Sequence, residues 1–234
     1  MGSGQDFAQI VPMLIDRFCC LTIDLPGHGK TNFNRDYTME NTASAIVTLL
    51  DHLEIAQTHL IGYSMGGRLA LYLALNFPDR FPKAILESAS PGLKTEAEQR
   101  ARIEHDRTLA ARLEADFGQF LQDWYEQPLF RSLKNHSMFE ATIAKRSRNN
   151  PTQLAKSLRQ MSTGMQPNLW QELKQHQNPL LLIVGEYDRK FVAINQEMAT
   201  LCKTAQLAIV PDAGHNIHIE NVNAYTHHIK TFLN

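Results

Sequence analysis

One short motif in the sequence could supply a nucleophile. Residues 62–66, Gly-Tyr-Ser-Met-Gly, follow the apolar run 58–61 and precede the apolar, helix-like stretch 67–75. A strand, a sharp turn and a helix in this order are what a G-x-S-x-G nucleophile elbow requires. Such a turn strains the serine backbone and exposes its hydroxyl, while glycines on either side avoid collisions with the strand and helix. The segment therefore predicts Ser64 as a nucleophile or base, the alternative being a tight turn with a capping serine.

Two later segments offer an acid and a base. The apolar run 179–185 predicts a buried parallel strand with Asp188 just beyond it, and a second predicted strand, 205–210, leads to His215. Serine, then acid, then histidine is the chain order of one known class of catalytic triad. The imidazole would take a proton, and the carboxylate would fix the imidazole tautomer and stabilise the imidazolium. Glu186 is the alternative acid, and a loop histidine bonded to backbone is the alternative for His215.

A metal site is not expected. His215 and His218 could be mistaken for a ligand pair, but no set of thiols or carboxylates with zinc-site spacing accompanies them. We therefore expect neither a metal nor another cofactor.

The composition excludes several classes of protein. The 234 residues are 43% hydrophobic and 20% charged with a formal net charge of −1, and no basic run interleaves with aromatic residues, so nucleic acid is not an expected partner. No apolar stretch approaches bilayer length and no charged-then-apolar leader opens the chain. Cys19, Cys20 and Cys202 resemble small core residues of a reducing compartment. We expect a soluble cytoplasmic protein without membrane insertion, and the oligomeric state stays open.

The remaining pattern alternates strands and helices. A short helix is expected at 7–14, a strand at 18–24, an amphipathic helix at 39–53 and a strand at 84–88. This alternation predicts a mostly parallel sheet with helices on both faces, an α/β fold.

The alternation stops in the middle of the chain. Residues 94–170 contain several helical patterns and no convincing strand. A helical insertion between two sheet strands predicts a cap over the strand ends, where such sheets bind ligands. We therefore expect a core in two parts, 1–91 and 171–234, separated by a helical cap, 92–170.

Several motifs carry a family resemblance. Leu-Pro-Gly-His-Gly at 25–29, the elbow with its flanks at 61–70 and Ala-Gly-His-Asn at 213–216 resemble the α/β-hydrolase superfamily. More specific segments, mostly in the cap, resemble the 2-succinyl-6-hydroxy-2,4-cyclohexadiene-1-carboxylate synthase family of menaquinone and phylloquinone biosynthesis; they lie at 87–93, 123–130, 146–150 and 185–191. The resemblance covers nearly the whole chain.

This resemblance implies a lyase rather than a hydrolase. The family eliminates pyruvate from an enolpyruvyl-substituted succinyl cyclohexene carboxylate after a base removes a ring proton. By position, Ser64 with His215 would be the proton-abstracting pair and Asp188 the orienting acid. The Met65 N–H would help to hold negative charge on the succinyl carbonyl oxygen.

A substrate with three carboxylates calls for fixed cations, and arginine suits bidentate carboxylate recognition best. Arg68 lies four residues after Ser64, on the same helix face. The resemblance adds two cap arginines and two pocket aromatics, namely Arg102, Arg146, Tyr63 and Trp124. Arg107 and Arg148 are the rivals for the cap positions, any single arginine could be a surface residue, and the two aromatics could serve packing alone.

The sequence departs from the family at its start. The family has a strand ending in a His-Gly-Phe type segment, which supplies a second oxyanion N–H, and this chain begins just after it. That strand would lie between the strands expected at Cys19 and Leu60, so two ladders would lack a partner. We expect a start placed too far downstream or a truncation, with poor stability and weak activity, because one oxyanion donor contributes about 10²–10³ in rate.

Two rival functions remain open at this point. One is a serine esterase or C–C bond hydrolase that forms an acyl-enzyme at Ser64. The other is a binding protein that keeps the fold without catalysis, against which the presence of all three triad residues argues. Whether the product enters menaquinone or phylloquinone synthesis is also left open.

Overall fold

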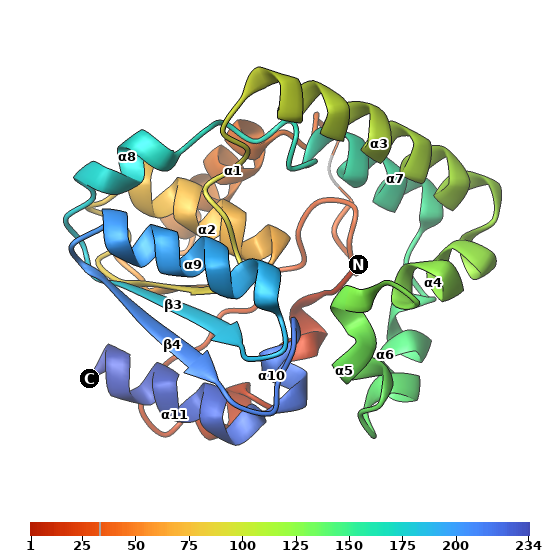
Figure 1. Cartoon of the computed structure of the whole chain (residues 1–234). Helices are drawn as coiled ribbons and strands as arrows, with labels where there is room; N and C mark the ends of the chain where they lie inside the picture. Colours follow the sequence, from red (N-terminus) through yellow and green to blue (C-terminus); the bar gives the residue numbers. More distant parts are fainter. Residues whose placement is uncertain (33) are drawn as a thin grey trace.

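The computed structural model describes residues 1–32 and 34–234. Its sheet contains four parallel strands in the order of the chain (Figure 1). The strands are β1 (Leu60–Tyr63), β2 (Ala84–Glu87), β3 (Leu180–Gly185) and β4 (Ala205–Val210). Their first residues are in register, since Leu60 pairs with Ala84, Ala84 with Leu180, and Leu180 with Ala205. The carboxyl ends of all four strands therefore meet at one edge.

Helices cover both faces of the sheet. α2 (Met65–Asn76), α8 (Trp170–Gln175) and α9 (Arg189–Leu201) pack on one face, against a core that includes Leu86 and Leu182. α10 (Ile217–Glu220), α11 (Val222–Leu233) and residues 10–14 pack on the other, around Ile85 and Ile183. β2 and β3 are buried along their whole length, which explains why their sequences are apolar except for Glu87 at the end of β2. α1 (Met39–His52) packs outside α2.

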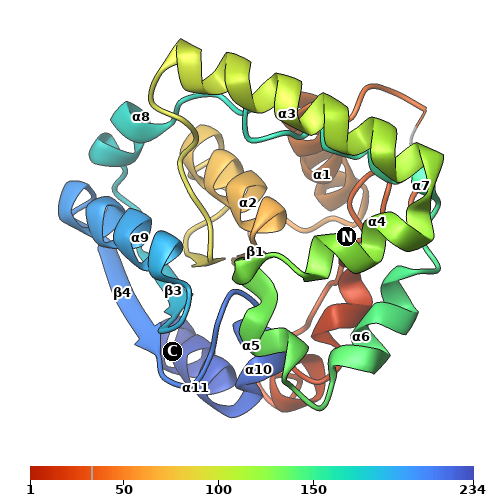
Figure 2. The same ribbon diagram turned by 45° about the vertical axis from the view of Figure 1, so that its right-hand side comes forward.

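The middle of the chain is helical, as the sequence predicts. The helices are α3 (Glu96–Ala115), α4 (Phe117–Tyr125), α5 (Arg131–Lys134), α6 (Phe139–Arg146) and α7 (Pro151–Gln160), with a short 3₁₀ turn η3 at Pro128–Phe130. They form a layer beside the sheet, on the side toward which β3 points (Figures 1 and 2). Local signals set their starts: Thr95 and Glu98 form a capping box at α3, and Asn150 caps α7 ahead of Pro151.

The strand predicted at 18–24 is wrong. These residues have no regular secondary structure and belong to no ladder. The reason lies at the outer edge of β1. The backbone N–H groups of Leu60 and Ser64 donate to carbonyl oxygens on the β2 side. The N–H and C=O groups of the residues that alternate with them, Ile61 and Tyr63, therefore face away from β2. A cavity lined by 18–23 and 60–62 separates the two segments, and a strand needs a hydrogen-bonded neighbour that this slot lacks within the described residues.

Two smaller expectations also need correction. The helix predicted at 7–14 is a pair of 3₁₀ turns, η1 (Gly4–Phe7) and η2 (Val11–Met13), with Pro12 removing one backbone donor from the second turn. Cys202 is buried as expected and Cys20 is half-buried, but Cys19 is exposed because it lies on the unpaired segment. Among the described helices, none is long and apolar enough to cross a membrane.

Candidate active site

The three predicted triad residues meet at the carboxyl edge of the sheet. Ser64 follows β1, Asp188 follows β3, and His215 lies in the loop after β4. The Nε2 atom of His215 lies 3.1 Å from the Ser64 Oγ, and its Nδ1 atom lies 2.6 Å from an oxygen of Asp188. A carboxylate only accepts hydrogen bonds, so Nδ1 carries the proton and the Nε2 lone pair faces the serine hydroxyl. This is the arrangement of a serine–histidine base.

The acid of this arrangement is Asp188, which is buried together with His215. The alternative, Glu186, is exposed and accepts a hydrogen bond from the backbone N–H of Asp212. Asp188 also caps α9 by accepting from the Phe191 N–H. The buried carboxylate is therefore held from two sides.

The elbow has the strained geometry that its sequence predicts. Ser64 has φ 50° and ψ −109°, a conformation in which few non-glycine residues are found. A Cβ atom at Gly62 would lie 2.3 Å from the carbonyl oxygen of Gly66, and one at Gly67 would lie 2.7 Å from the Ala89 Cβ. A Cβ atom at Gly66 would meet nothing within 4 Å. The close approaches therefore involve Gly62 and Gly67, and the expectation that Gly66 also avoids a collision is wrong.

The backbone of Met65 lies where an oxyanion donor is expected. Met65 is the first residue of α2, and the first N–H groups of a helix have no intrahelical acceptor. The positive end of the helix dipole adds to this donor.

Aromatic side chains enclose the His215 ring. Tyr63, Phe191 and Phe130 lie with ring centroids 5.3, 4.8 and 6.1 Å from that of His215. They come from β1, α9 and the 3₁₀ turn of the helical layer, so three separate elements restrict the imidazole.

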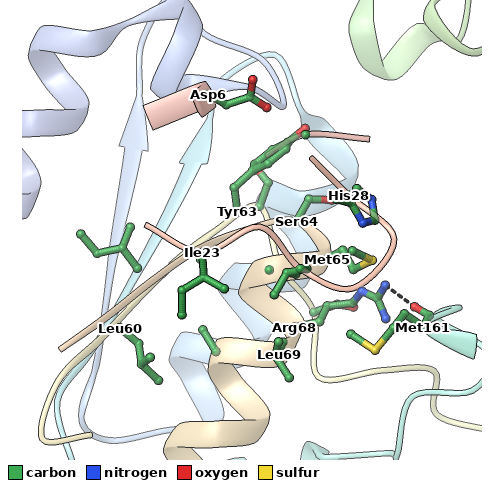
Figure 3. Close-up of a pocket in the computed structure, with 18 of the residues that line it drawn as sticks. Asp6, Ile23, His28, Leu60, Tyr63, Ser64, Met65, Arg68, Leu69 and Met161 are labelled. Carbon is green, nitrogen blue, oxygen red and sulfur yellow. Dashed lines mark hydrogen bonds between the residues drawn. The ribbon is translucent and has the colours of Figure 1, made fainter. Parts of the chain in front are cut away.

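The cavity that separates 18–23 from 60–62, about 1090 Å³ in all, extends to the Ser64 hydroxyl (Figure 3). All five predicted binding residues line it, namely Tyr63, Arg68, Arg102, Trp124 and Arg146. The rivals Arg107 and Arg148 are exposed and are not among the described residues that line the cavity. The structure thus brings three arginines to the same cavity as the triad.

Arg68 is buried without a carboxylate partner among the described residues. Its guanidinium donates to the carbonyl oxygen of Met161 at 2.7 Å (Figure 3). It also donates to the Gln166 side chain at 3.1 Å. Burial, together with the nearby charge of Arg102, lowers the pKa of Arg68 to about 10. The group stays charged at neutral pH, and its positive charge is available to an anion.

The other two arginines have acidic partners. Arg102 donates through Nε to both oxygens of the buried Asp106, at 2.8 and 2.9 Å, and Asp106 also accepts from Ser162. This contact uses Nε, so the terminal nitrogens of Arg102 are free to bind a ligand. Arg146 is buried, and it donates to the Tyr125 hydroxyl and, at 3.3 Å, to Asp6.

The charge of Arg146 is strongly stabilised. Burial by itself lowers the pKa of a guanidinium, but the neighbouring Tyr125 and Asp6 outweigh it, and the net effect raises the pKa of Arg146. Trp124 lies beside the cavity, stacked on Phe120 with centroids 5.6 Å apart. Its position fits both cavity lining and packing of the helical layer.

Sequence reasoning missed His28, a buried residue that lines the cavity close to Ser64 (Figure 3). Its Nδ1 donates to the Pro26 carbonyl oxygen at 3.2 Å, so Nε2 is the acceptor. Burial is the main cause that lowers the pKa of His28 to about 3, and the ring is neutral. The available signal was the Leu-Pro-Gly-His-Gly motif at 25–29.

A second missed residue is Asp106, which orients Arg102. Its spacing of four residues from Arg102 on a predicted helix was the signal. Across the described residues, no group of three or more histidine, cysteine or acidic side chains has the arrangement of a metal site.

Known proteins share this sequence and architecture. The α/β hydrolase fold family matches residues 1–222. A relative from Bacillus subtilis (strain 168) is 39% identical over 99% of this chain and 86% of its own length. The 2-succinyl-6-hydroxy-2,4-cyclohexadiene-1-carboxylate synthase of Enterobacter sp. (strain 638) is 35% identical over 94% of this chain and 83% of its own length.

A solved structure gives the same result. MenH from S. aureus is similar with a TM-score of 0.94 and 35% identity, covering 99% of this chain and 89% of that one. The sequence relatives, the shared fold and the strand-end site agree with one another. The chain belongs to the α/β-hydrolase superfamily and, within it, to the 2-succinyl-6-hydroxy-2,4-cyclohexadiene-1-carboxylate synthase family.

Proposed function

We propose that this chain eliminates pyruvate from 2-succinyl-5-enolpyruvyl-6-hydroxy-3-cyclohexene-1-carboxylate. The observation that carries the proposal is the 3.1 Å contact between His215 Nε2 and the Ser64 hydroxyl at the mouth of a cavity lined by arginines. The family membership supports the same reaction. The step would belong to menaquinone or phylloquinone synthesis and would take place in the cytoplasm.

The reaction begins with proton removal. The ring C2–H lies next to the succinyl carbonyl, which makes it the acidic position. The Ser64 oxygen, with its own proton passed to His215, takes the C2 proton. Asp188 stabilises the imidazolium that forms. The Met65 N–H stabilises the negative charge that develops on the succinyl carbonyl oxygen.

The electron pair then moves through the ring. A double bond forms between C2 and C3, the former C3–C4 double bond shifts to C4–C5, and the C5–O bond breaks. The leaving group is the enolate of pyruvate, which takes up one proton on carbon. The products are pyruvate and the 2,4-cyclohexadiene, and no oxidant or water is consumed.

Three arginines can bind the three negative charges of the substrate. The substrate carries three carboxylates, on ring carbon 1, on the succinyl chain and on the enolpyruvyl group. Arg68, Arg102 and Arg146 supply three cations to one cavity, and guanidinium groups bind carboxylates with two parallel hydrogen bonds. Tyr63 and Trp124 would contact the apolar part of the substrate.

Pyruvate release tests the proposal. The chain is mixed with the substrate, made by the preceding condensing enzyme, and pyruvate is followed with lactate dehydrogenase and NADH. Ser64→Ala is the control, and we expect release with wild type only. If the wild-type chain is folded and labelled at Ser64 by a fluorophosphonate but releases no pyruvate above the spontaneous rate, the proposed reaction is wrong. Burst release from p-nitrophenyl acetate would then favour an esterase.

A further inference from the structure

A second carboxylate–imidazole pair lies behind the triad. The Nδ1 atom of His218 donates to Glu87, at 2.8 Å from one carboxylate oxygen and 3.0 Å from the other. Both side chains are completely buried, and neither lines the active-site cavity. Burying such polar groups is costly unless they are paired. Because the pair lies outside the cavity, it cannot contact a substrate there, and its role must be to hold other residues in place.

Glu87 is bonded to both segments that carry the proton-transfer groups. Its backbone carbonyl oxygen accepts from the Ser64 N–H at 2.8 Å. Its carboxylate accepts from the backbone N–H of His218 at 3.1 Å. Ser64 is the strained residue of the elbow, and His218 lies three residues after His215. One residue at the end of β2 therefore joins the elbow to α10, which begins two residues after His215 and continues the loop that carries it.

The aromatic contacts continue this connection. The Tyr63 ring lies 4.6 Å from the His218 ring and 5.3 Å from the His215 ring, measured between centroids. Phe7 stacks on His218 at 5.2 Å. A shift of His218 would therefore move Tyr63, which is one of the rings that enclose His215.

We propose that Glu87 and His218 are a positioning pair that sets the distance between Ser64 and His215. The proposal rests on the roles proposed for Ser64 and His215, but it does not depend on which substrate they act on. Misplacement of a catalytic group by about 1 Å can cost roughly 100-fold in rate. Because the pair lies outside the cavity and acts on the proton-transfer groups, its loss should lower kcat by a much larger factor than it changes KM, which can shift slightly through Tyr63.

Two substitutions at position 218 separate a positioning role from mere packing. His218→Asn places an amide N–H where the Nδ1–H lies but removes the ring. His218→Phe keeps the ring between Tyr63 and Phe7 but removes the donor. If the hydrogen bond to Glu87 positions the loop, the Asn variant keeps most of the activity and the Phe variant loses roughly 10- to 100-fold in kcat. A packing role would give the reverse order.

The rate of Ser64 labelling by a fluorophosphonate is measured beside kcat and KM for pyruvate release. Labelling reports on the Ser64–His215 contact whatever the natural substrate is, so a wild type that is labelled but releases no pyruvate overturns the proposed reaction alone. Leu173→Ala, in a buried core position outside the cavity, is the control for stability. It should lower the melting temperature without changing either rate.

A second variant covers the case in which His218→Phe does not fold. Glu87→Gln keeps the size of the side chain but replaces the oxygen that lies 3.0 Å from His218 Nδ1 by an NH2 group, which cannot accept from Nδ1–H. Its kcat and labelling rate should fall in the same direction by a smaller factor. A crystal structure of either folded variant should show the His215 Nε2 beyond hydrogen-bond reach of Ser64. A folded His218→Phe or Glu87→Gln protein with wild-type kcat, labelling rate and His215 position would overturn the proposal.

Discussion

The two sides of the active-site cavity are built in different ways. On the sheet side, Ser64, Asp188 and His215 follow the ends of three parallel strands, and short hydrogen bonds join them directly. On the helical side, Arg102 and Arg146 project from α3 and α6 and are oriented by the acidic partners Asp106 and Asp6. The sheet side holds the groups proposed to move a proton. The helical side holds charges that can only bind. Arg68 projects from α2, but it is grouped with them because its guanidinium donates to Met161 and Gln166, which follow α7. Substitutions on the two sides should therefore affect different kinetic constants.

The largest effect is expected on the sheet side. Ser64→Ala and Asp188→Asn should each lower kcat by roughly 10³- to 10⁴-fold, because the first removes the proton acceptor and the second no longer holds the correct histidine tautomer. KM should change little, since neither side chain is proposed to bind a carboxylate. Steady-state kinetics of pyruvate release measure both constants. A Ser64→Ala protein that keeps a tenth of the wild-type kcat would contradict the comparison.

The backbone of the elbow gives the next effect, with a matched pair of variants. Gly62→Ala should destabilise the protein by about 1–3 kcal/mol or more, because the new Cβ atom would lie 2.3 Å from a carbonyl oxygen. Gly66→Ala should keep the free energy of unfolding within about 1 kcal/mol of wild type, because alanine suits a helix and nothing lies near its Cβ. Urea denaturation compares the two. Equal losses would show that the contacts around the elbow are misassigned.

On the binding side, Arg68→Met should raise KM by roughly 10- to 100-fold, equivalent to about 1.4–2.7 kcal/mol, because a buried charged hydrogen-bond donor is lost. The kcat value should stay within a few-fold. Arg107→Met is the matched control, since Arg107 is exposed and pairs with Glu104 outside the cavity. The same kinetic assay applies to both variants. A fall in kcat with KM unchanged for Arg68→Met would remove the distinction between the two sides.

The smallest effect is a change of stability with pH at His28. This residue belongs to neither side of the cavity, because it lies in the loop after the unpaired segment 18–24. Its pKa is lowered from 6.5 to about 3, mainly by burial. The unfolded chain binds this proton below about pH 6.5 and the folded chain does not, so the contribution to stability is present above that pH and is lost as the pH falls toward 3. Between pH 6.5 and 5.5 the loss should be about 1 kcal/mol.

The charged groups that act on His28 include Asp24, Arg146 and the N-terminal amine. His28→Gln should flatten the dependence of the urea midpoint on pH over this interval, and Arg107→Met again provides a neutral reference. An unchanged slope in His28→Gln would assign the acid sensitivity to other groups.

Much of the sheet side could be predicted because its signals are local. An apolar run followed by a glycine-rich turn defines both a strand and the residue at its end, so β1 to β4 and the triad were recognised within one or two residues of their observed positions. The segment 18–24 shows the limit of such reasoning. Its residues favour a strand, but a strand forms only beside a hydrogen-bonded neighbour, and none of the described strands pairs with this segment.

The helical side could be predicted only in part. Arg102 and Arg146 were singled out by family resemblance, since an arginine on a surface helix and one in a pocket look alike in a sequence. Their partners were not foreseen: Asp6 lies 140 residues from Arg146. The same holds for His28, because its loop lacks the hydrogen-bonded strand that precedes His215.

Apart from the segments 7–14 and 18–24, the sequence alone determined which elements form, in which order, and which side chains stand at strand ends, because these follow from interactions between residues close along the chain. Only the tertiary structure decided which atoms meet. Ser64 and His215 are 151 residues apart, and Glu87 and His218 are 131 apart. The parallel register of the four strands brings them to one edge, and no local pattern encodes that register.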